Sequence, residues 1–157
     1  MNAALLEQLY RAHGPGVLRR ARQILRDDEE ARDALHEIFL SLADHEPFDQ
    51  RGGTTAWFYT RTTHFCLNRL RDNNNRARLR LERGERMPIS APPRGENVAL
   101  ASDVLARLPP ELAEAAIYYY CDEMTHDEIA LLMGCSRRHV GHILERLHLM
   151  TRITKCG

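Results

Sequence analysis

The hydrophobic residues recur at helical spacing along the whole chain, and no segment shows the strict alternation of apolar and polar residues that is typical of a strand. The sequence predicts a first helix ending near Gly14 and a second helix that has Pro15 in its first turn. The apolar positions of these two segments are Leu5, Leu6, Leu9, Tyr10, Val17, Leu18, Ala21, Ile24 and Leu25. We therefore expect an all-α protein.

Two further helices are predicted before residue 72. Asp28 can cap the first of them, and the acidic residues of its first turn favour the helix dipole. Its expected buried stripe is Ala31, Leu35, Ile38, Phe39 and Leu42. After a loop marked by Pro47 and two glycines, a long helix opens at Thr54 or Thr55. We expect Trp57 and Phe58 of that helix to lie in the core, because aromatic residues at helical spacing are usually buried.

The segment from Asp72 to Asn97 differs from both flanks, because it is rich in asparagine, arginine, proline and glycine. We interpret its first part as a frayed basic helix end and its later part as a flexible linker. The expected organisation is therefore two small helical domains, over residues 1–75 and 99–157, joined by a linker over residues 76–98. In the second domain, Leu108 and two prolines separate a short helix from one over about Glu111–Tyr120.

The last segment contains the strongest local pattern. Thr125 is followed three residues later by Glu128, which is the spacing of a capping box. A short apolar helix follows, Gly134 supplies a turn, and Ser136 can cap a last helix that buries Val140, Leu144 and Leu147. The opposite face of this last helix carries Arg137, Arg138, Gly141, His142 and Glu145. Two short helices joined by a glycine turn, with basic residues at the start of the second, predict a DNA-binding helix-turn-helix.

Composition and charge exclude several classes of protein. The 157 residues include 22 Lys+Arg and 22 Asp+Glu, so the chain does not bind DNA by bulk charge alone. The net charge is −1 over residues 1–70, +3 over 71–100 and −2 over 101–157. No apolar run approaches the length of a membrane span, and the N-terminus lacks the pattern of a secretory signal. We therefore expect no membrane insertion. The four cysteines form no CxxC pair, so we expect reduced thiols in a cytoplasmic protein.

The two halves together resemble a bacterial RNA polymerase sigma factor of the extracytoplasmic-function group. The first part of the resemblance covers most of residues 9–71, and it includes Leu9–Leu18, Asp28–Leu40, Ala56–Tyr59 and Asn68–Arg71, which look like region two. The second part covers residues 104–147, and it includes Leu108–Leu112, Asp127–Ala130, Gly134–Ser136 and Val140, which look like region four. The order and spacing of these motifs carry the resemblance.

The resemblance implies an all-helical protein with two DNA-binding domains, no enzymatic activity, no catalytic residue and no cofactor. Its implied partners are core RNA polymerase and promoter DNA, and an anti-sigma protein is a further implied regulator. The helix from Asp28 to Leu42 would contact the clamp of the polymerase through Asp33, His36 and Glu37, which lie outside the predicted apolar stripe.

The resemblance also implies two DNA-binding surfaces. The helix from Thr54 to Asp72 would face the −10 element and help to open it, with contacts from Tyr59, Arg61, His64, Asn68 and Arg71. The Phe48–Thr55 loop is the candidate for holding an extruded base. The helix-turn-helix would recognise the −35 element through Arg137, Arg138, His139 and His142.

Departures from the usual family pattern keep two alternatives open. Thr60 and Arg61 replace the usual arginine and aliphatic residue, and the run from His139 to Ile143, which includes Gly141-His142, stands where the family usually has Thr-Val-Lys-Ser-Arg, so that two cations are lost. One alternative is therefore a sigma-like protein that binds polymerase or a regulator without recognising a promoter. Another is a self-standing helix-turn-helix regulator, which would leave the first domain unexplained.

A metal site or an enzyme fits the sequence less well. Cys135, His139 and His142 lie at helical offsets of four and three, but the paired ligands typical of zinc sites are absent. The chain has no glycine-rich phosphate loop, nucleophile elbow or metalloprotease motif. We therefore expect neither a metal nor catalysis.

Overall fold

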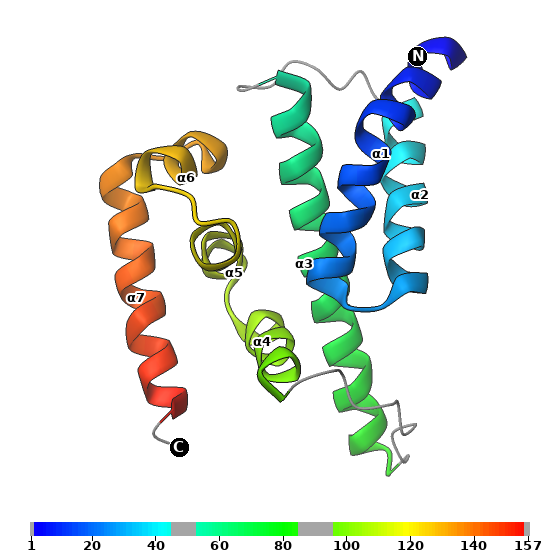
Figure 1. Cartoon of the computed structure of the whole chain (residues 1–157). Helices are drawn as coiled ribbons and strands as arrows, with labels where there is room; N and C mark the ends of the chain where they lie inside the picture. The colour runs from blue at the N-terminus through cyan, green and yellow to red at the C-terminus, as the bar shows by residue number, and fades with distance from the viewer. Residues whose placement is uncertain (1, 45–52, 85–95, 156–157) are drawn as a thin grey trace.

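The computed structural model describes residues 2–44, 53–84 and 96–155, and within these ranges every regular element is a helix (Figure 1). The all-α prediction is confirmed. The first half of the molecule consists of α1 (Ala3–Leu25), α2 (Asp28–Asp44) and α3 (Gly53–Glu82). The second half consists of α4 (Glu96–Arg107), α5 (Pro110–Ala116), the π-helical turn η1 (Ile117–Cys121), α6 (His126–Met133) and α7 (Arg137–Lys155).

The predicted break near Gly14 is wrong, because α1 runs without interruption through Pro15. A proline inside a helix lacks the N–H of the backbone ladder and costs about 3 kcal/mol. Packing of α1 against α2 and α3 offsets that cost, since Gly14 and Val17 on either side of Pro15 are buried. Local breaker residues were therefore a poor guide here, because tertiary packing decides the outcome.

The start of α2 differs by one residue from the prediction. The cap is Asp27 and not Asp28: Oδ1 of Asp27 accepts from the Glu30 N–H at 3.0 Å, and its carbonyl accepts from the Ala31 N–H. Arg26 adopts a left-handed conformation with φ of 56° and reverses the chain just before this cap. The predicted buried stripe of α2 is confirmed, because all five of its residues are buried.

The helix-turn-helix is confirmed in its elements and caps. The Glu128 N–H donates to Thr125 Oγ1 at 3.2 Å, and the His139 N–H donates to Ser136 Oγ at 3.1 Å. Gly134 joins α6 to α7 with φ of 67°, a conformation that favours glycine. Val140 and Leu147 are buried as predicted, but Leu144 is only half-buried and Ile143 is enclosed instead. The face of α7 against α5 and α6 is thus rotated slightly from the predicted stripe.

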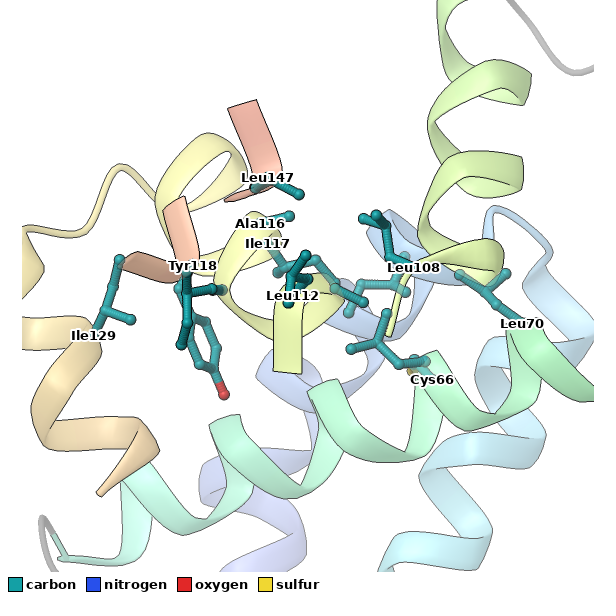
Figure 2. Close-up of a cluster of buried hydrophobic side chains, with 14 of the residues drawn as sticks. Cys66, Leu70, Leu108, Leu112, Ala116, Ile117, Tyr118, Ile129 and Leu147 are labelled. Carbon is teal, nitrogen blue, oxygen red and sulfur yellow. The ribbon is translucent and has the colours of Figure 1, made fainter. Parts of the chain in front are cut away.

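The hydrophobic core continues from one half into the other. One buried cluster includes Leu25 of α1. The same cluster joins Leu70 of α3 to Leu108 and Tyr118 of the second half (Figure 2). A second cluster belongs to the first half alone, and it contains Phe58 at 3 % exposure with the half-buried Trp57 against it. The core placement predicted for these two aromatic residues is therefore confirmed for Phe58 and in part for Trp57.

The third helix extends further than the sequence indicates. It begins at Gly53, one residue before the earlier of the two predicted starts, and it continues through residues 76–82, which we assigned to the linker. Residues 85–95 of that segment and most of the predicted base-holding loop lie outside the described residues. The domain boundaries themselves stay a prediction.

Candidate polymerase and nucleic-acid interfaces

Four of the five residues predicted to face the −10 element share one side of α3. Arg61, His64, Asn68 and Arg71 follow each other at spacings of three, four and three, which places them along one helix face. Arg61, His64 and Asn68 are exposed, and Arg71 is half-buried. The helix thus presents a polar row suited to contact with a nucleic-acid backbone.

Tyr59 lies on a different side of α3 from this row. It aligns with Thr63, Cys66 and Leu70 at spacings of four, three and four, and that side faces the interior. The Arg20 guanidinium lies 3.6 Å from the centre of the Tyr59 ring. Burial, followed by the neighbouring Asp122 carboxylate, raises the pKa of Tyr59, so its hydroxyl stays protonated. In this arrangement Tyr59 is half-buried between Arg20 and Tyr118.

Arg20 of α1 is a buried cation that the sequence reasoning missed. Its Nη1 and Nη2 each donate to one carboxylate oxygen of Asp122 at 2.9 Å, and its Nε donates to Thr63 Oγ1 at 2.8 Å. The side chains of Arg20 and Asp122 are 8 % and 14 % exposed. The sequence does hold a signal, because Arg20 interrupts the apolar stripe between Val17 and Ile24. An arginine at such a position requires a partner once it is buried.

Two further contacts connect α3 with the second half. His64 Nε2 lies 2.9 Å from Oε1 of Glu114, and the same oxygen accepts from the Tyr118 hydroxyl at 3.0 Å. The rings of Tyr59 and Tyr118 stack with their centres 5.8 Å apart. Burial, followed by the Glu114 carboxylate, raises the pKa of Tyr118. The polar row of α3 is therefore partly engaged with α5 and η1 through His64.

The residues predicted to recognise the −35 element lie on the first two turns of α7, and all four are exposed. Arg138 and His142 share one face at a spacing of four. Arg137 Nε is 3.8 Å from an Asp127 carboxylate oxygen, and His139 Nε2 is 2.6 Å from Oε1 of Glu111. A Cβ added to Gly141 would meet no atom within 4 Å, so the fold itself does not require glycine there.

The predicted polymerase-binding residues lie on the outer face of α2. Asp33, His36 and Glu37 are all exposed. His36 also lines an apolar groove of about 440 Å³ between α1 and α2, together with Leu6, Tyr10, Phe39 and Leu40. Leu40 is 62 % exposed and adds apolar surface to this groove. The acidic face and the groove adjoin.

In the described part of the chain, no three histidine, cysteine, aspartate or glutamate side chains are grouped in a way that could hold a metal ion. Cys66, Cys121 and Cys135 are free thiols. Among the same residues, no helix has both the length and the apolar character needed to cross a bilayer.

Comparison with known families assigns both halves. The family model for sigma-70 region 2 matches residues 9–76, and that for sigma-70 region 4 matches residues 100–146. The chain belongs to the sigma-70 family. The pairing of these two regions is typical of extracytoplasmic-function sigma factors, and it supports a role in promoter recognition during transcription initiation. A search of the curated proteins found no match.

Proposed function

We propose that the chain is an alternative sigma factor that binds core RNA polymerase in the cytoplasm and directs it to its own set of promoters. The observation that carries this proposal is the presence of region 2 and region 4 in one chain and in the family order. Each region also exposes polar residues on the helix expected to meet DNA. Neither region needs high affinity for free DNA, because the polymerase would hold both near the promoter.

The proposed polymerase contact is the outer face of α2. Asp33 and Glu37 supply negative charge there, and the adjoining groove with Leu40 supplies apolar surface. An interface that combines an apolar centre with charged residues at its edge is typical of specific protein contacts. A basic helical partner with apolar side chains would fit this surface.

The proposed DNA contacts divide between α3 and α7. Arg61, His64, Asn68 and Arg71 would meet the −10 element, and Tyr59 would join them only if its buried side of α3 became uncovered. Arg138 and His142 would enter the major groove at the −35 element, with Arg137 and His139 beside them.

An anti-sigma protein that covers the α2 face would prevent polymerase binding, and we propose this form of control.

Transcription from reconstituted polymerase tests the proposal. Core enzyme with the full chain should start transcription at a cognate promoter, and core enzyme alone should not. Asp33→Ala should slow association with polymerase roughly two- to tenfold at low salt, because charges at the edge of an interface act mainly on the association rate. Asp103→Ala, an exposed acid on α4, is the matched control. Failure of the chain to bind core polymerase would contradict the proposal.

A second candidate function is supported by the altered residues Thr60, Arg61, Gly141 and His142. It is a sigma-like protein that binds polymerase without recognising a promoter. Polymerase binding combined with an absence of promoter-dependent open complexes would favour this second function. Permanganate footprinting of the −10 region distinguishes the two functions, because it detects unstacked thymines.

A further inference from the structure

The contact between the two halves contains a buried ion pair beside a large apolar cluster. Arg20 of α1 and Asp122, which follows η1, are 102 positions apart in sequence and make two hydrogen bonds of 2.9 Å. Thr63 of α3 completes the set by accepting from Arg20 Nε. No other ion pair within the described residues buries both side chains to this degree.

A cleft and a small cavity adjoin this pair. A cleft of about 510 Å³ lies beside it, lined by His13, Arg19, Arg20, Tyr59 and Asp122 among other residues. On the other side of Arg20, a cavity of about 60 Å³ separates α1 from α4 and η1. The cleft lies mainly between α1 and α3, whereas the cavity marks lost contacts on the surface between the halves. The interface can therefore separate with less loss than a fully packed core would suffer.

The arrangement in Figure 1 is also too short for the proposed function. By their numbering, the −35 and −10 elements are about 25 base pairs apart, which is roughly 85 Å of B-form DNA. A compact chain of this length has a radius of gyration of about 15 Å, so it is about 40 Å across. The two halves must separate before α3 and α7 can contact both elements together.

We propose that the Arg20–Asp122 pair is a latch that keeps the free chain closed, so that Tyr59, His64 and Arg71 of α3 are released for promoter contact only when the second half moves away. While the latch is closed, Tyr59 lies under Arg20 against Tyr118, His64 faces Glu114, and Arg71 Nη2 donates to the Leu108 carbonyl at 3.3 Å. The consequence for promoter contact rests on the proposed function. The latch itself does not.

The chain carries a natural reporter of opening. Cys66 is fully buried on α3, beside Leu108 and Leu112 of the second half (Figure 2). Burial raises the pKa of the Cys66 thiol to about 12, so in the closed chain little of the reactive thiolate forms at pH 8. Alkylation of Cys66 by iodoacetamide, measured by site-resolved mass spectrometry, therefore reports the fraction of open molecules.

The test uses the full-length free chain. Asp122→Asn should speed alkylation of Cys66 roughly 10- to 100-fold, because it leaves the Arg20 charge buried without its partner in the closed state. Arg20→Gln should act in the same direction. The double variant should fall short of the product of the two single effects, since both remove the same interaction.

The matched control is Asp28→Asn. Asp28 forms an ion pair with Arg22 Nε at 3.0 Å, but both side chains are largely exposed, so the rate for Cys66 should change less than twofold. Far-ultraviolet circular dichroism must show unchanged helix content, which separates opening from unfolding. An unchanged rate in Asp122→Asn, or effects that multiply in the double variant, would overturn the latch. The alkylation experiment contains no polymerase. A failure of the chain to bind polymerase in the separate binding experiment would therefore contradict the proposed function and not the latch.

Discussion

The two candidate DNA surfaces differ in how available they are within the same chain. On α7, Arg138 and His142 are exposed and have no partner among the hydrogen bonds and ion pairs given above for the described residues. On α3, the half-buried Tyr59 stacks on Tyr118 and His64 faces Glu114 of the second half. Arg61 and Asn68 of α3 are exposed, so the −10 surface depends on the relation between the halves only at Tyr59, His64 and Arg71.

Truncation of Tyr118, which lies where the two halves meet, should have the largest effect on the contact that holds Tyr59 of the −10 surface. Tyr118 is fully buried and its ring stacks on Tyr59 of the other half. Tyr118→Ala should therefore lower the free energy of unfolding by about 3–5 kcal/mol. Urea denaturation followed by circular dichroism measures the loss. The neighbouring Tyr119, which is 39 % exposed, provides the control: Tyr119→Ala should cost less than about 0.5 kcal/mol. Similar losses for the two variants would contradict the central position of Tyr118.

Arg138 tests the surface that is already open. Arg138→Ala should weaken binding of the polymerase complex to the −35 element by about 1–3 kcal/mol and relax base preference there, as expected when a base-edge contact is lost. Arg146, two turns later on α7, is an exposed arginine for comparison. Its replacement by alanine should weaken binding to all sequences alike. A footprint that keeps its position and preference in Arg138→Ala would reject the assignment.

Gly141 separates the needs of the fold from those of DNA contact on α7. Gly141→Ala should stabilise the free chain by about 1 kcal/mol, because alanine is the better helix former and a Cβ meets no neighbour there. The melting temperature measures this change. If promoter binding falls in the same variant, the glycine serves close approach of DNA to the helix. A lower melting temperature would show that the open space at Gly141 is occupied in solution.

His64 should have the smallest effect of the four. Its side chain is 46 % exposed, so loss of its contact with Glu114 in His64→Ala should cost about 0.5 kcal/mol and speed Cys66 alkylation no more than threefold. His64→Gln, which keeps a hydrogen-bonding side chain, is the control. An acceleration as large as that of Asp122→Asn would move the main link between the halves from Arg20 to His64.

Features fixed by neighbouring residues could be predicted from the sequence. The caps at Thr125 and Ser136, the turn at Gly134 and the buried stripe of α2 each depend on residues within one or two helical turns. The continuity of α1 through Pro15 could not be predicted, because burial of its flanks against two other helices outweighs the local penalty. The sequence indicates where helices begin more reliably than whether packing will join two of them.

The candidate sites divide in the same way. The rows on α3 and α7 follow from helical spacing, and the structure brings most of the named residues onto common faces. The Arg20–Asp122 pair could not be predicted, because no local pattern relates two residues so far apart. The placement of Tyr59 depends on the same pair, so its role in DNA contact stays a prediction.

The length of α3 has a consequence for how the molecule approaches a charged surface. Its thirty residues make a rod of about 45 Å, and its far end extends beyond α1 and α2 (Figure 1). That end carries Arg76, Arg78 and Arg80, although the whole chain is neutral. A polyanion exerts little net electrostatic force on a neutral molecule with one cationic end, but it does exert a torque that turns this end toward the polyanion. The chain should therefore be oriented by DNA before it is attracted to it, with the tip of α3 leading.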